Sequence, residues 1–182
     1  MRYNNNMKYL TKADLYKTID TLIIDNGFSF DAINYCVDSI ELAKIVCKNL
    51  TIEYLDFKTT SICGMLYKTE KSTSIALNSR RPAAGKNFDC MHELIHYWLH
   101  DTETFYCDTR EKSYMNSYLE WQANEGAAQF LMPHQVFVPA YMRLKNAQTP
   151  FDEMINRLAR RFNVGSQSVK VRITSLSNDK FL

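Results

Sequence analysis

The chain has 182 residues and a formal net charge of +2, with 46% hydrophobic and 23% charged residues. This length suits one folding unit with a substantial core and is short for two ordinary domains. The charge is too evenly balanced to predict a nucleic-acid-binding surface, which needs lysine and arginine concentrated on one face. A basic cluster occurs only late in the chain, and we interpret it as a solvated helix face: Arg157, Arg160, Arg161, Lys170 and Arg172.

Membrane insertion and secretion are not indicated. No apolar run approaches the roughly 20 residues of a membrane span, and Met1 to Asn6 leads into no apolar region of the kind found in signal peptides. We therefore expect a cytoplasmic protein that does not bind membranes. The five cysteines form no C-x-x-C pair, so neither a disulfide framework nor a cysteine-based metal site is indicated.

The first 50 residues are predicted to be helical. Thr11 to Asp14 resembles a capping box, and apolar residues at helical spacing follow it to about Asp25, where Asn26 and Gly27 end the helix. A second helical stretch is predicted from Ile33 to about Asn49. The role of residues 1–50 stays open.

Between Ile52 and Asn78 the apolar period changes from that of a helix to that of strands. Residues 62–67 and 74–78 flank a polar turn at 68–73, which predicts a small antiparallel sheet that contains a hairpin. A loop over residues 80–86 follows. Asn87 or Asp89 is a plausible N-cap for the next helix, which runs to about His100.

The rest of the chain is predicted to be mainly helical, so the fold class is α+β. A helix from about 117 to 132 ends at Pro133. Two helical segments, 151–162 and 166–176, then form a C-terminal part over residues 150–178. Their connecting turn is similar to that of a helix-turn-helix, but DNA binding is a weak hypothesis because few basic residues accompany it. We predict one domain over residues 1–182.

The motif that carries chemistry is His92-Glu93-Leu94-Ile95-His96. Histidines four apart on a helix project from one face, so their ring nitrogens can converge on one ion. Glu93 then points toward the open coordination position, where a carboxylate can take a proton from water. The spacing therefore predicts a metal site with a general base.

A catalytic zinc site usually has three protein ligands. His100 is a poor third ligand, because eight helical residues place it about 12 Å from His92 along the axis, and we expect it to cap or pack. Thr102 excludes a third histidine ten positions after His92. Glu120 on the next helix is a better candidate, with Asn124 on the same face to hydrogen-bond a ligand imidazole. The alternative is a solvated glutamate beside a core alanine stripe.

Together these residues resemble the ImmA/IrrE metallopeptidase family. The resemblance covers about residues 52–176 and rests on the HExxH motif with His100, then Glu120-x-x-Ala123-Asn124 and Leu131-Met132-Pro133. It implies a zincin-like core, with a small sheet above a two-helix site, and places the third ligand at Glu120. Two departures stand out: Gly126-Ala127 should loosen the packing behind the site, and Gln122 replaces a common glutamate.

The resemblance implies an endopeptidase with one Zn²⁺ held by His92, His96 and Glu120, with Glu93 as the catalytic base. Its substrate would be a specific regulatory protein, such as a helix-turn-helix repressor of a mobile element or a stress response. Residues 75–78 could align the substrate by strand addition. Five side chains are candidates for contacts to the oxyanion or the substrate: His134, Tyr118, Tyr97, Tyr106 and Tyr114. The alternative is a non-catalytic zinc module that sequesters a transcription factor or toxin; the oligomeric state is not predicted.

Overall fold

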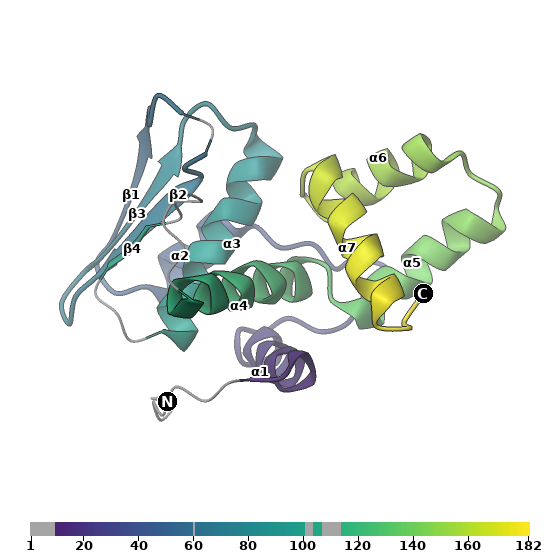
Figure 1. The fold of residues 1–182 in the computed structure, drawn as a ribbon, viewed down its shortest axis with the longest axis horizontal. Coiled ribbons are helices and arrows are strands. Elements are labelled where there is room, and N and C mark those ends of the chain that lie inside the picture. The colour runs from purple at the N-terminus through teal and green to yellow at the C-terminus, as the bar shows by residue number, and fades with distance from the viewer. Residues whose placement is uncertain (1–9, 60, 101–103, 107–113) are drawn as a thin grey trace.

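The computed structural model describes residues 10–59, 61–100, 104–106 and 114–182, with only the backbone described for 104–106 and 114–116. The α+β class is confirmed (Figure 1). In chain order the elements are α1 (Lys12–Asp25), α2 (Ser39–Val46), β1 (Leu50–Leu55), β2 (Gly64–Lys68), β3 (Thr73–Asn78), α3 (Ala83–Leu99), β4 (Thr104–Tyr106), α4 (Tyr114–Leu131), α5 (His134–Asn146), α6 (Phe151–Arg161) and α7 (Ser166–Asn178).

The described strands form one sheet in the order β1-β3-β2-β4. The predicted hairpin is present, since β2 and β3 pair antiparallel with Leu66 opposite Ile75. The sheet as a whole is mixed rather than antiparallel, because β3 inserts between β1 and β2 and runs parallel to β1. Residues 75–78 therefore hydrogen-bond to strands on both sides. The prediction that this segment takes up a substrate strand is wrong, because β3 has no open edge there.

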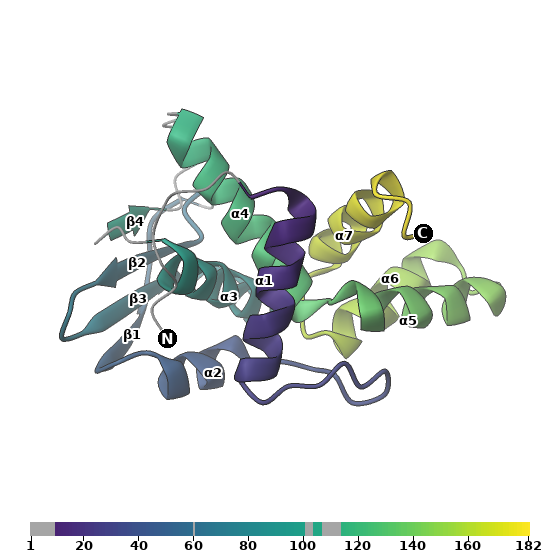
Figure 2. The same ribbon diagram turned by 90° about the horizontal axis from the view of Figure 1, so that it is seen from below.

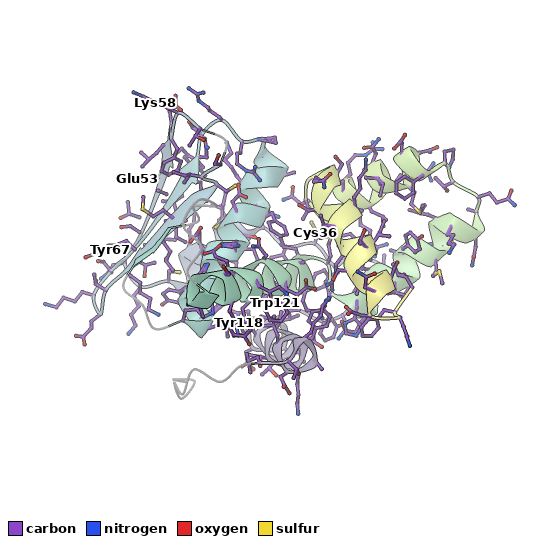
Figure 3. The ribbon with its side chains drawn as sticks, in the orientation of Figure 1. Cys36, Glu53, Lys58, Tyr67, Tyr118 and Trp121 are labelled. Atoms are coloured by element: carbon purple, nitrogen blue, oxygen red, sulfur yellow. The ribbon has the colours of Figure 1, made fainter. Side chains whose placement is uncertain are left out.

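One face of the sheet is buried beneath helices. Thr73, Ile75 and Leu77 alternate inward along β3, as a half-buried strand requires, and α3 packs on β2 and β3. Glu53 and Tyr67 lie on the opposite, exposed face (Figure 3). Helix α3 thus packs against one face of the sheet, and exposed side chains lie on the other face.

Helix α4 crosses α3 and is covered in turn by α1, while α5, α6 and α7 gather at the far end of α4 from the sheet (Figures 1 and 2). The capping box of α1 is confirmed, with Thr11 and Asp14 exchanging hydrogen bonds. One continuous set of buried apolar side chains joins these helices to the sheet, and it includes Leu15, Ile19, Leu66, Ile75, Leu94, Ile95, Ala123, Ala127, Phe130, Phe137, Leu158 and Leu176.

Two local predictions differ from the structure, and one helix was not predicted. Helix α2 begins only at Ser39, because the Asp38 carboxylate caps the backbone N–H groups of Ile40 and Glu41. Helix α3 begins after Pro82, so Asn87 and Asp89 lie inside it and are not N-caps. Helix α5 was not predicted; it contains Pro139, a residue that sequence rules read as a helix breaker.

Arg172 is not on a solvated face. It is 1% exposed, and its guanidinium donates to the Met132 carbonyl at 3.1 Å and to the Tyr16 hydroxyl at 2.5 Å. It also lies 3.4 Å from Glu125. The buried cation thereby ties α7 to α4 and α1, and it is removed from the basic surface that the sequence suggested.

A helix that crosses a membrane must be both long and strongly apolar. Within the described part of the chain, no helix meets these two conditions.

Candidate metal centre

The HExxH motif lies in the C-terminal half of α3, where the helix packs between the sheet and α4. His92, Glu93 and His96 are 3%, 1% and 1% exposed, respectively. Three buried polar side chains on one helix are costly unless they find partners or an ion. Their burial therefore marks this helix face as a site.

Glu120 from α4 completes a cluster with the two histidines. His92 Nε2 lies 3.0 Å from His96 Nε2 and 3.3 Å from Glu120 Oε2, and His96 Nε2 lies 3.3 Å from Glu120 Oε1. Two ligands bonded to one ion at 2.0–2.1 Å and a tetrahedral angle lie about 3.3 Å apart. The three side chains fit a divalent ion with an open fourth position. Among the described residues, this is the group of His, Cys, Asp and Glu side chains that could hold a metal.

The electrostatics of the cluster favour a cation at its centre. Burial lowers the pKa of His96 to about 3, so its ring is neutral and has a lone pair to offer. Burial also disfavours a charged His92, but the hydrogen bond to Glu120 and the negative charges of Glu93 and Glu120 together outweigh it and raise the pKa of His92. Burial would raise the pKa of Glu120, yet hydrogen bonds from His92 and His96 lower it to about 2. A carboxylate anion therefore faces two imidazole nitrogens.

Both histidines contact further side chains through their other ring nitrogen. Asn124 Oδ1 lies 3.2 Å from His92 Nδ1, while the Asn124 amide N–H donates to the Glu120 carbonyl at 2.8 Å. His96 Nδ1 lies 2.8 Å from Nδ1 of His100, which is the C-cap of α3 and no part of the three-residue cluster. Each imidazole is thus held at two points.

Glu93 has an unusual environment for a carboxylate. Both of its oxygens are buried and have no hydrogen-bond partner, and burial raises the pKa of Glu93 to about 8. Gly64 of β2 lies against it, so close that a Cβ there would come within 2.8 Å of Glu93 Oε1. Sequence reasoning did not find Gly64, since it is far from the motif in the chain and belongs to no local pattern.

One turn before the motif, Asp89 forms a bidentate ion pair with Arg81. Arg81 Nε lies 2.5 Å from Asp89 Oδ2, and Arg81 Nη2 lies 3.0 Å from Asp89 Oδ1. Burial is the largest influence on Asp89 and raises its pKa despite the guanidinium. Because Arg81 precedes α3, this pair fixes the start of the helix that carries the site.

The three oxyanion candidates whose side chains are described make their contacts away from this cluster. Beyond the C-terminal end of α4, His134 stacks on Tyr16 and lies against Phe181 with the two rings tilted. Tyr118 lies on the side of α4 that faces α1 (Figure 3) and donates to the Leu10 carbonyl. The Tyr97 hydroxyl donates to the Val46 carbonyl. The side chains of Tyr106 and Tyr114 lie outside the described part of the chain.

Gly126 packs tightly, contrary to the expectation that it loosens the core behind the site. A Cβ at Gly126 would lie 3.0 Å from Ile95 of α3 and 3.3 Å from Ile19 of α1. The glycine instead lets three helices approach one another closely.

Comparison with known proteins gives two similarities. Residues 47–174, well over half of the chain, match the family model named Peptidase M78, described as an IrrE N-terminal-like domain. A transcriptional regulator from Mycobacterium tuberculosis has a similar fold, with a TM-score of 0.54 and 17% sequence identity over 86% of this chain and 45% of the regulator. This chain thus spans less than half of that protein, and the likeness concerns the fold alone. No curated protein matches the sequence.

Proposed function

Because the chain belongs to the IrrE N-terminal-like family of peptidases, which confirms the resemblance of its motifs, we propose that it is a zinc-dependent endopeptidase. The observation that carries the proposal is the convergence of His92, His96 and Glu120 beside the buried carboxylate of Glu93. Two imidazoles and one carboxylate are the ligand set of many catalytic zinc sites.

In the proposed mechanism, His92, His96 and Glu120 would hold one Zn²⁺. When bound, the ion supplies a Lewis acid that polarises a peptide carbonyl and makes water more acidic. Glu93 accepts the proton of the attacking water and then donates it to the departing amine nitrogen. The partnerless oxygens of Glu93 suit this role, since no protein donor competes for them. Asn124 orients His92 through the ring nitrogen that does not face the ion.

We further propose that the substrate is a regulatory protein, with a helix-turn-helix repressor as the first candidate. This rests on the family resemblance. The expected cellular location is the cytoplasm, and direct nucleic-acid binding is not proposed, because Arg172 is withdrawn into the core.

The proposal is tested with Glu93→Gln in purified, Zn²⁺-loaded protein. Each protein is incubated with a proteome-derived peptide library and, separately, with a candidate helix-turn-helix repressor, and new amino termini are read by mass spectrometry. We expect Glu93→Gln to lower the cleavage rate by about 10²–10⁴-fold, the usual contribution of a general base, while Zn²⁺ content stays at the wild-type level.

Two variants complete the design. Glu120→Gln should lose both Zn²⁺ and cleavage, whereas Glu41→Gln, which changes an exposed carboxylate paired with Lys44, should alter neither. Cleavage by Glu93→Gln at the wild-type rate would reject the mechanism. A wild-type protein that binds the repressor and never cuts it would favour the sequestering module instead.

A further inference from the structure

A chain of buried side chains leads from His96 back to α4. His96 Nδ1 lies 2.8 Å from His100 Nδ1, and His100 Nε2 lies 2.8 Å from Gln122 Oε1. His96, His100 and Gln122 are 1%, 6% and 4% exposed. Water therefore has little access to these two contacts.

The backbone explains how His100 reaches His96. His100 leaves the helix with extended angles, φ −120° and ψ 135°, while its backbone N–H still donates to the His96 carbonyl at 3.0 Å. Lys68 of β2 donates to the carbonyls of both His100 and Tyr97. Together these contacts fix the imidazole of His100 beside that of His96.

The proton positions follow from metal binding, so this step rests on the proposed function. A histidine that binds an ion through Nε2 has no proton there, and a neutral ring then carries its proton on Nδ1. His96 must therefore donate from Nδ1, and His100 must accept at its own Nδ1. The proton of a neutral His100 is then on Nε2, from which it donates to Gln122 Oε1.

We propose that His100 and Gln122 are positioning residues that hold His96 in its metal-binding tautomer and ring orientation. Helix α4 then supports the site three times: Glu120 faces the ion, Asn124 holds His92, and Gln122 holds His96 through His100. This gives a function to a histidine that lies outside the ligand cluster. We call the hydrogen-bonded series His96, His100 and Gln122 the relay; the neutral amide of Gln122 is its last acceptor.

The test compares two replacements of His100. His100→Phe keeps the volume of the ring and removes the acceptor for the His96 N–H, whereas His100→Asn is smaller and retains an acceptor oxygen. Zn²⁺ affinity is measured by competition with a chromophoric chelator, and the visible spectrum of bound Co²⁺ reports the coordination geometry. We expect His100→Phe to weaken Zn²⁺ binding by about 10–100-fold and to alter the Co²⁺ spectrum. His100→Asn should recover most of the affinity, and a packing role predicts the reverse order.

The other end of the relay provides a second, independent comparison. Gln122→Met keeps the length of the side chain without an acceptor and should weaken Zn²⁺ binding, while Gln122→Glu retains an acceptor and should not. His134→Asn is the matched control, because His134 is remote from the cluster. Thermal melting of each metal-free variant shows whether it is folded.

The outcomes separate this inference from the proposed function. Wild-type affinity in both His100→Phe and Gln122→Met, with binding lost in Glu120→Gln, would overturn the relay and leave the metal site standing. A wild-type protein that binds no Zn²⁺ would overturn both.

Discussion

At the scale of single residues, the bare backbone of Gly64 determines where the carboxylate of Glu93 can lie. A Cβ at Gly64 would lie 2.8 Å from Glu93 Oε1 and 3.4 Å from the Glu93 Cγ. A methyl group there would push the side chain of the proposed base aside. None of the three atoms nearest to this Cβ belongs to a proposed ligand.

Gly64→Ala should therefore reduce cleavage without removing the metal. Since displacement of a reacting group by about 1 Å can cost about 10²-fold in rate, we expect a fall of about 10–100-fold in kcat, with Zn²⁺ affinity near that of the wild type. Gly85→Ala in α3 is the control: its Cβ would meet no atom closer than 3.5 Å, so activity should persist. Equal kcat values for Gly64→Ala and the wild type would show that β2 does not position Glu93.

The sequence could predict the residues whose spacing is local. His92, Glu93 and His96 lie on one helix, and four-residue spacing alone brings the two rings together. Glu120 needed the resemblance as well. Gly64 could not be predicted, because its function is to have no side chain at a contact between distant segments.

At the scale of elements, Asn87 connects α3 to two other parts of the chain. Its side-chain oxygen accepts from the Ser39 N–H at the start of α2, and its amide group donates to the carbonyls of Val37 and Asn163. Asn163 belongs to the turn between α6 and α7. One buried amide thus satisfies three backbone groups and fixes the helix that carries the site.

Asn87→Asp should be nearly as destabilising as Asn87→Ala at neutral pH. The carboxylate can accept from Ser39 but cannot donate to the two carbonyls, so buried polar groups lose their partners. We expect each variant to cost about 3 kcal/mol of unfolding free energy, measured by urea denaturation with Zn²⁺ present. If Asn87→Asp were as stable as the wild type, the two donated hydrogen bonds would contribute nothing.

Element types were more predictable than their arrangement. Apolar periodicity located α1, the β2–β3 hairpin, α3, α4, α6 and α7. The parallel pairing of β1 with β3 is a long-range choice that no local period encodes. Helix α5 was missed because Pro139 lies inside it.

At the scale of the whole molecule, Glu125 is the centre of the contacts that join α1, α4 and α7. It accepts from the Tyr16 hydroxyl at 2.6 Å and the Ser175 hydroxyl at 2.9 Å, and Lys12 Nζ lies 3.1 Å away. Burial would raise the pKa of Glu125, but these hydrogen bonds and the Lys12 charge lower it below its ordinary value. The Glu125 carboxylate thereby connects the first and last helices of the chain through α4, and its neighbours stabilise its negative charge.

This lowered pKa predicts a pH-dependent contribution to stability. A carboxyl group with a depressed folded-state pKa stabilises the fold above its unfolded pKa, about 4.3, and loses that contribution as the pH falls through the folded value. Glu125→Gln should therefore cost about 2 kcal/mol at pH 7 and less in acid, once the pH has fallen through the folded-state pKa. Thermal melts of wild type and variant across this range measure it. Glu153→Gln, which affects an exposed pair with Arg157, should change little at either pH; a Glu125→Gln deficit independent of pH would contradict the prediction.

The family match begins at residue 47, yet the fold does not. Leu15, Ile19 and Ile23 of α1 belong to the same buried set as Leu94 and Ile95 of α3. The sequence predicted helices in the first 50 residues but not what those helices cover, since their partners lie far along the chain.

The place of α1 has a consequence for biosynthesis. Tyr16 precedes its partner Glu125 by 109 residues and its partner Arg172 by 156 residues. During translation α1 therefore leaves the ribosome long before the helices that cover its apolar face exist. A nascent chain that already carries the HExxH motif still lacks α4, which contains Glu120 and packs against α1. Completion of the proposed metal site and burial of the apolar face of α1 therefore both depend on the synthesis of α4.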